Sequence, residues 1–430
     1  MKELAYQLPA STSRTHYSAI IVALVAFGVS SAVVLILGAH RPLESDAPFF
    51  LSIAENLARE HSFVNSLSPW ATIPASDRMP AWPFFVSIFI ALLPHAEPNL
   101  IIRLAGIILH AATATTLTEL TFRLSRRQPV ALTTGLAYAL YPSALFLVDQ
   151  GMSEPLFVFI LILALLALVS GWVRTAAALS GLCCLVRPNF LIVPILLVIV
   201  WRIFATETIR AGLRGVWTAA VCAGLFVAPT GAWTVRNYFF TGHFPVISTI
   251  QGLTLYGANN EVVANSLEYW GYWVQPDQVG GPERRTLARQ MSPYELDRYY
   301  TRMAVEYWHH SWFCLPRLIL GKLVRAFVPI PWNASWAGYA ASGCRLILYA
   351  LFLSTMRYWA RVAGRQYILA LSAIFLMSLI TTVIYYGTAR FTFMMEAPMF
   401  PCAIAGLWAR LESARLGSAR ELVDATSYRL

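Results

Sequence analysis

Acidic and arginine residues of this 430-residue chain lie beside its long apolar runs, and their types suit a reaction in which a phosphate leaves. A carboxylate can take a proton from a hydroxyl group. Arginine offers a planar fork of donors to phosphate oxygens, keeps its charge, and stabilises negative charge that develops on a leaving group. The candidates are the acids Glu44, Asp46, Asp77, Asp149 and Glu154 and the bases Arg78, Arg187, Arg236 and Arg390.

These residues also have purely structural interpretations. Glu44 and Asp46 could belong to a solvated loop, with one of them capping a helix over 49–57. Glu154 begins an apolar run, where a carboxylate is favoured by the helix dipole. The arginines could extend to lipid head groups. The chemical interpretation therefore requires a fold that brings them to one place.

The composition indicates a membrane protein. Hydrophobic residues make up 57% of the chain, charged residues only 13%, and the mean hydropathy is +0.58, which excludes an ordinary soluble enzyme. The net charge of +10 would suggest a nucleic-acid partner in a soluble protein. Here the basic residues form short clusters between apolar runs, where they set membrane orientation. We therefore expect membrane lipids, and no nucleic acid, among the partners.

The apolar runs predict an all-α, polytopic transmembrane bundle of about ten spans with external interfacial helices. About 20 apolar residues are needed to cross the hydrocarbon core. The shorter runs at 80–94 and 315–331 are predicted to lie in the interface, because the first has three prolines and the second has three basic residues. The predicted spans are 18–39, 100–122, 129–148, 155–172, 175–186, 189–204, 216–234, 342–357, 366–386 and 391–410.

The positive-inside rule orders these segments across the membrane. It places the basic clusters near 123–127, 202–214 and 357–365 inside and the acids of 40–80 outside. All the candidate residues then fall at the outer face. We expect a cytoplasmic tail over 1–17, a transmembrane catalytic module over 18–235 that includes the external loop 40–83, an external loop region over 236–313, an interfacial helix and transmembrane helices over 314–410, and a cytoplasmic tail over 411–430.

Several short motifs, in order, resemble the C-type-fold membrane glycosyltransferases, the group that contains the protein O-mannosyltransferases and the lipid A aminoarabinose transferase. The resemblance covers about residues 20 to 410. The motifs are Glu44-Ser-Asp46 with the helix that follows it, Arg78-Met-Pro80-Ala-Trp-Pro83, Ala139-Leu-Tyr141-Pro142 before Ser153-Glu154-Pro, Gly181-Leu-Cys-Cys-Leu-Val-Arg187-Pro188, Trp233-Thr-Val-Arg236-Asn237-Tyr238, Gly257-Ala-Asn259-Asn260, and Arg390-Phe391.

The resemblance implies an inverting glycosyltransferase that moves a sugar from a polyprenyl-phosphate carrier to an acceptor hydroxyl at the outer face. Asp46 stands at the position of the family's catalytic carboxylate. The family often has Asp-Glu there, whereas this chain has Glu44-Ser-Asp46, so either acid could be the base. Phe391 stands where many relatives have tyrosine. The donor's departing phosphate would be neutralised by arginines among Arg78, Arg187, Arg236 and Arg390, with Glu154 and Lys322 as further site candidates.

The implied partners are a polyprenyl-phosphate-linked sugar donor and an acceptor lipid, glycan or protein. No cofactor is implied, although Glu44 and Asp46 could share a divalent metal. We expect a multi-pass protein of the cell membrane, in bacteria the inner membrane. One alternative is a transporter or flippase of lipid-linked sugars, which would place ionisable residues near the midplane. Another is a non-catalytic partner of a glycosylation complex.

Overall fold

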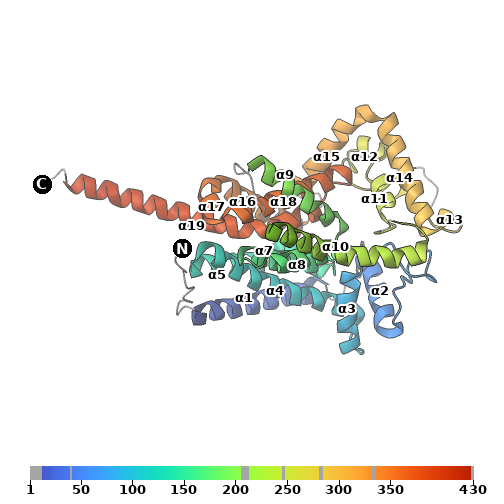
Figure 1. The fold of residues 1–430 in the computed structure, drawn as a ribbon, viewed down its shortest axis with the longest axis horizontal. Coiled ribbons are helices and arrows are strands. Elements are labelled where there is room, and N and C mark those ends of the chain that lie inside the picture. Colours follow the sequence, from blue (N-terminus) through green and yellow to red (C-terminus); the bar gives the residue numbers. More distant parts are fainter. Residues whose placement is uncertain are drawn as a thin grey trace.

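The chain folds into a helical bundle with a smaller helical head at one end (Figure 1). The computed structural model describes residues 12–38, 41–204, 213–244, 247–279, 284–328, 330 and 335–427. Within those ranges the structure is helical and holds one isolated antiparallel bridge, between Val64 and Pro74, and no longer strand. The predicted all-α class is therefore confirmed.

The bundle and the head divide the helices between them. The bundle contains α1 (Thr12–Val33), η1 (Val34–Gly38), α4 (Pro98–Ser125), α5 (Gln128–Ala139), α6 (Pro142–Asp149), α7 (Glu154–Val169), α8 (Val173–Val186), η2 (Pro188–Ile192), α9 (Val193–Phe204), α10 (Leu213–Thr241), α16 (Trp336–Ser354), α17 (Met356–Val362), α18 (Arg365–Ile384) and α19 (Ala389–Ser427). The head contains α2 (Ala47–Glu60), α3 (Ala81–Leu92), α11 (Gln251–Gly257), α12 (Glu261–Asn265), η3 (Pro276–Val279), α13 (Arg284–Ala288), α14 (Pro293–His310), η4 (Trp312–Cys314) and α15 (Leu315–Phe327).

Six helices of the described chain are long and apolar enough to cross a membrane, so the protein has the architecture of a multi-pass membrane protein. They lie at Tyr17–Gly38, Pro98–Ser125, Gly215–Thr241, Trp336–Ser354, Arg365–Ile384 and Ala389–Arg415. A seventh span results if α5 and α6, which meet at a 45° bend, are counted together. The expected number of about ten spans is not confirmed.

The structure has fewer candidate spans than predicted because three of the predicted spans are shorter helices. Helices α7, α8 and α9 have 16, 14 and 12 residues, fewer than the roughly 20 that cross a bilayer. The chain turns after α7 at Gly171, whose positive φ of 81° suits glycine. Helix α8 ends because Arg187 precedes Pro188, which disfavours helical backbone at Arg187. Counting apolar residues overlooked these local breaks.

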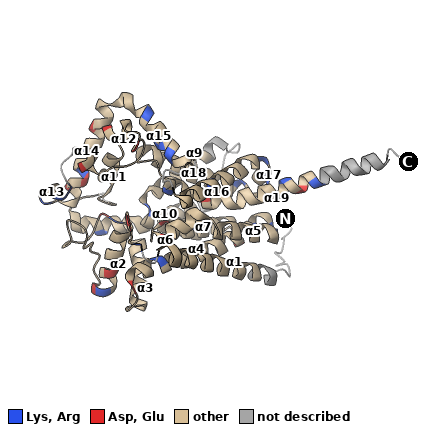
Figure 2. Ribbon diagram, turned by 180° about the vertical axis from the view of Figure 1, so that it is seen from behind, with Lys and Arg blue, Asp and Glu red and all other residues tan. Residues whose placement is uncertain are grey.

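The two segments predicted to be external, 40–83 and 236–313, lie together at the head end (Figure 1). Helices α3 and α15 form where interfacial helices were expected. Charged residues are sparse along the middle of the bundle helices and gather at its ends and on the head (Figure 2). The arrangement thus puts the candidate residues of both segments at one end of the molecule.

The core of the bundle surrounds α4 and α19. In the apolar windows of these helices, 67% and 83% of residues are buried, against 22% or fewer for α1, α10 and α16. The outer helices therefore present apolar side chains to the surroundings, as expected in lipid. The head has two small cores of its own. They are formed by Leu253, Tyr256, Ala288, Leu296, Tyr300 and Ala304, and by Val263, Ala264, Val274 and Leu318.

A buried ion pair fastens α16 to α19 inside the bundle. Arg345 donates through Nε to Glu396 at 2.8 Å, and the two side chains are 5% and 0% exposed. Tyr141 and Tyr349 each donate to the same carboxylate at 2.7 Å, and Thr392 at 3.1 Å. Because the carboxylate is fully hydrogen-bonded, the pair can remain ionised away from water.

Breaking this pair should destabilise the bundle strongly. Arg345→Met leaves the Glu396 charge buried without its partner, which costs about 3–5 kcal/mol. We expect the apparent midpoint of thermal unfolding, measured in lipid nanodiscs, to fall by several degrees. Arg357→Met, at an exposed position of α17, is the control. An Arg345→Met protein that unfolds at the wild-type temperature would contradict the structural role of the pair.

Candidate active site

Five predicted site residues from five separate segments meet where the head joins the bundle. Asp46 lies 3.4 Å from Nη2 of Arg78 through Oδ1 and 3.3 Å from Nη1 of Arg390 through Oδ2. Glu154 forms ion pairs through Oε1 with Arg187 and with Nε of Arg390. Arg390 therefore bridges the two carboxylates. These five side chains are named the arginine–carboxylate cluster below.

Local backbone geometry separates Asp46 from Glu44. Ser45, between them, has a positive φ of 59°, which is uncommon outside glycine. Glu44 is exposed and has no ion pair or hydrogen bond from its carboxylate to the described residues. Asp46 occupies the N-cap position of α2 but makes no capping bond, and Pro48, in the first turn, has no N–H to offer. Its carboxylate therefore pairs with arginines instead of capping the helix.

The segment before α3 holds Arg78 in place. The guanidinium lies over the ring of Phe49, with its central carbon 4.9 Å from the ring centroid. Its Nη1 donates to the backbone oxygen of Asp77 at 3.1 Å. Because Arg78 is 8% exposed and held on two sides, it reaches Asp46 as a fixed donor rather than a mobile surface charge.

Helix ends supply the remaining members of the cluster. Glu154 begins α7, where the helix dipole favours negative charge. Arg187 follows the last residue of α8, and Arg390 is the second residue of α19. Hydrogen-bonding capacity remains in the cluster, since the buried Nε of Arg78, Nε of Arg187 and Oε2 of Glu154 have no partner among the described residues. Buried donors of this kind are usually satisfied by water or a ligand.

The five side chains of the cluster sum to a net charge of +1, from three arginines and two carboxylates, and the Asp77 carboxylate lies 3.8 Å from Nη1 of Arg78. Burial alone would raise the pKa of Asp46, but the charges of Arg78, Arg390 and Arg187 outweigh it and hold that pKa below its usual value of 3.8. Asp46 is thus an anion at neutral pH. The guanidinium N–H groups that have no partner among the described residues suit a bound phosphate.

Arg236, one of the predicted phosphate-binding residues, lies apart from these contacts. Arg236 donates to the backbone oxygen of Ala75 at 2.7 Å and lies over the rings of Phe63, Trp233 and Phe240. Its described contacts do not include a member of the arginine–carboxylate cluster. Its position therefore supports the segment that precedes Arg78.

Lys322 is fully buried between the head and the bundle. Its Nζ donates to Oδ1 of Asn259 at 2.7 Å and to the backbone oxygens of Val383 and Ile384 at 3.0 and 3.4 Å. Burial lowers its pKa to about 7. The three contacts use the three donors of the ammonium group, so the structure places Lys322 at the end of α18 rather than against lipid.

Tyr386 belongs to the site but was not among the predicted residues. Burial raises its pKa to about 12, and Arg390 and Asp46 are among the charges that act on it. Its ring lies 4.9 Å from that of Phe391. A tyrosine is thus present beside Arg390, although Phe391 itself has no hydroxyl. The sequence signal was the pair Tyr385-Tyr386 shortly before Arg390, which a count of charged residues does not register.

The residues described by the structure do not contain a group of three or more His, Cys, Asp or Glu side chains able to hold a metal ion. The sequence allows Glu44 and Asp46 to be joint ligands of a metal ion. In the structure Glu44 is exposed, whereas Asp46 lies among arginines.

Comparison with known proteins supports the fold. No protein-family model and no curated protein sequence matches the chain. The Archaeoglobus fulgidus oligosaccharyltransferase in the apo form superposes with a TM-score of 0.54 at 12% sequence identity, over 95% of this chain and 52% of that chain. The archaeal oligosaccharyltransferase AglB from Archaeoglobus fulgidus, in complex with an inhibitory peptide and a dolichol-phosphate, gives a TM-score of 0.53 at 13% identity, over 96% and 52% of the two chains.

A third structure, ArnT from Cupriavidus metallidurans bound to undecaprenyl phosphate, gives a TM-score of 0.43 at 13% identity, over 94% of this chain and 79% of that chain. The resemblance to C-type-fold glycosyltransferases is confirmed at the level of the fold by the archaeal structures. This chain spans about half the length of those archaeal chains.

The lowered pKa of Asp46 predicts how its contribution to stability varies with pH. A carboxylate whose pKa is lowered by folding stabilises the folded protein above its ordinary pKa of 3.8, and that contribution is lost as pH falls through the folded-state pKa. The difference in thermal midpoint between wild type and Asp46→Asn should stay constant from about pH 8 to 5 and shrink below about pH 4. A difference that already shrinks well above pH 5 would mean a raised pKa.

Proposed function

We propose that this protein is an integral-membrane glycosyltransferase that transfers a sugar, with inversion, from a polyprenyl-phosphate carrier to an acceptor hydroxyl. The arginine–carboxylate cluster is the observation that carries the proposal. It combines a carboxylate that can accept a proton with three arginines that can bind a phosphate. The likeness in fold to membrane oligosaccharyltransferases supports the same class of reaction.

The arginines of the cluster suit the increase in negative charge that the reaction produces on the lipid phosphate. A polyprenyl-phosphate sugar is a phosphodiester with one negative charge. When the acceptor oxygen forms a bond to the anomeric carbon, the bond from that carbon to the phosphate oxygen breaks, and the lipid phosphate departs with a second negative charge. Arg78, Arg187 and Arg390 are positioned to stabilise that charge, with two of them keeping a free, buried Nε–H.

Asp46 receives the proton of the acceptor hydroxyl in this mechanism. Its lowered pKa makes it a weak base while Arg78 and Arg390 pair with it. A bound donor phosphate competes for the same two arginines and adds a negative charge nearby, which raises the pKa of Asp46. The base therefore strengthens when the donor binds. Glu154 holds Arg187 and Arg390 at the positions from which they reach the phosphate.

The proposal also includes the orientation of the protein in the membrane and the side from which the acceptor arrives. The head, where the predicted external segments gather (Figure 1), is assigned to the outer side of the membrane by the positive-inside rule, and the bacterial inner membrane is the expected location. The acceptor reaches the cluster from the head, because Asp46 and Arg78 both lie in head segments.

A transporter of lipid-linked sugars is the alternative function. It would move labelled lipid across the membrane without forming a glycosidic bond.

Replacing the proposed base tests the mechanism. Asp46→Asn should lower the transfer rate by at least about 100-fold, because it removes the proton acceptor. Binding of undecaprenyl phosphate should be kept or strengthened, since the variant removes a negative charge from the site. Radiolabelled polyprenyl-phosphate sugars and a crude acceptor extract measure transfer, and fluorescence titration measures lipid binding. Loss of transfer in Glu44→Gln but not in Asp46→Asn would assign the base to Glu44.

Changing the shape of one arginine tests phosphate binding. Arg187→Lys keeps the charge but loses the planar fork and the free Nε–H, so affinity for undecaprenyl phosphate should fall about tenfold. Arg59→Met, at an exposed ion pair of α2, is the control. Arg236→Met should weaken binding less than Arg187→Lys, because Arg236 lies outside the cluster. The reverse order would place the phosphate near Arg236.

A further inference from the structure

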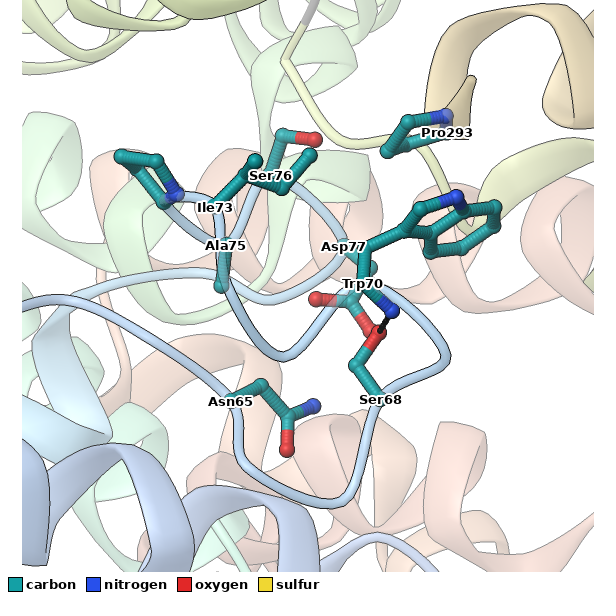
Figure 3. Close-up of a pocket in the computed structure, with 9 residues that line it drawn as sticks. Asn65, Ser68, Trp70, Ile73, Ala75, Ser76, Asp77 and Pro293 are labelled. Carbon is teal, nitrogen blue, oxygen red and sulfur yellow. Dashed lines mark hydrogen bonds between the residues drawn. The ribbon is translucent and has the colours of Figure 1, made fainter. Parts of the chain in front are cut away.

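A shallow pocket lies beside the arginine–carboxylate cluster, where the segment before α3 meets the start of α14 (Figure 3). Its enclosed space is small, about 10 Å³, and the rest of the pocket is open to solvent. Its polar lining comes mainly from Asn65, Ser68, Ser76 and Asp77, and Trp70 and Pro293 lie along one side. The pocket therefore combines an aromatic wall with several hydrogen-bonding groups.

Two buried side chains of this pocket, an amide and a carboxylate, have groups that make no hydrogen bond to the part of the chain that the structure describes. Asn65 is 1% exposed; its Oδ1 accepts from the backbone N–H of Leu67, whereas its Nδ2 has no partner. The Asp77 side chain is 6% exposed, and its nearest cation is Nη1 of Arg78 at 3.8 Å, beyond hydrogen-bonding distance. Figure 3 shows the Asn65 amide and the Asp77 carboxylate directed toward the same space. An unpaired buried amide is costly, so a ligand or water that accepts from Nδ2 of Asn65 is expected.

The chemistry of the two groups defines what fits between them. An amide nitrogen donates a hydrogen bond and a carboxylate accepts one, and a hydroxyl group can satisfy both at once. The enclosed space admits about one hydroxyl group, so a sugar ring would enter the pocket by one hydroxyl-bearing edge. Trp70 supplies an apolar surface at the side of the same space. We propose that the pocket binds a sugar ring of the acceptor, which makes the acceptor a glycan or glycolipid.

The pocket is connected to the proposed reaction centre through one side chain. Arg78 contacts Asp77 through Nη1 and Asp46 through Nη2. An acceptor ring held at Asn65 and Asp77 is thus separated from the proposed base by a single guanidinium group. The assignment of this ligand as the acceptor rests on the proposed glycosyl transfer, whereas the binding of a sugar at the pocket can be tested separately.

Contacts between the two walls keep the pocket formed. Ser76 and Thr249 share a hydroxyl–hydroxyl bond of 2.9 Å, and the N–H of Thr249 donates to the backbone oxygen of Ser76 at 2.9 Å. The indole N–H of Trp70 donates to the backbone oxygen of Met291 at 3.2 Å. Because these contacts join segments far apart in the sequence, the lining groups are positioned before a ligand arrives.

Saturation-transfer NMR on the full chain in lipid nanodiscs tests the pocket, with a panel of methyl glycosides as probes. We expect at least one glycoside to bind the wild type. Asn65→Leu, which removes the amide, and Asn65→Asp, which keeps its shape and the acceptor for Leu67 but removes the N–H donors, should each weaken that binding about tenfold. Asn265→Ala, at an exposed asparagine of α12, is the control.

The outcomes separate this inference from the proposed function. Binding of no glycoside, or binding unaffected by both Asn65 variants, would overturn the pocket assignment and leave a hydration site. Binding of a serine- or threonine-containing peptide in place of glycosides would overturn it in favour of a protein acceptor. Undecaprenyl phosphate, titrated into the same samples, reports the donor site. If a glycoside binds but undecaprenyl phosphate does not stabilise the protein, the proposed glycosyl transfer is contradicted and the sugar pocket is not.

Discussion

The shared ion pair of Arg390 is the interaction on which the site depends. One guanidinium contacts both the part-exposed Asp46 of the head and the buried Glu154 of the bundle, so it holds together two acids that would otherwise repel each other. Removing water makes unpaired charge expensive and paired charge strong. The same arginines that stabilise the carboxylates therefore also present N–H groups that a phosphate could accept from.

The position of Arg390 is in turn set by how the head packs on the bundle. Lys322 of α15 binds the carbonyl end of α18, and the N–H of Gly387 donates to the backbone oxygen of Gly271 at 2.8 Å. A Cβ on Gly387 would lie 2.2 Å from the backbone oxygen of Lys322, so only glycine permits this approach. These contacts fix the segment between α18 and α19, which directly precedes Arg390.

The proposed binding sites of the sugar donor and of the acceptor substrate are adjacent but lined by different groups. The arginines of the cluster present positive charge where a lipid phosphate would lie, whereas Asn65 and Asp77 present a donor and an acceptor where a hydroxyl would lie. Arg78 contacts both regions. A site of this kind acts mainly by positioning and by preorganised charge, since its groups are held by the fold before any substrate is bound.

The sequence by itself determined the class of protein and most members of the site. Composition and apolar run length imply a helical membrane protein because they report burial in lipid, and the types of Asp46, Arg78, Glu154, Arg187 and Arg390 indicate their chemistry. Only the tertiary structure decided that Asp46 and not Glu44 enters the cluster, that Arg236 lies outside it, and that Tyr386 and the Asn65 pocket lie beside it. These positions depend on contacts between distant residues, such as that of Arg390 with Asp46, 344 positions away, and on local turns such as the one at Ser45. Hydrophobic periodicity contains information on neither.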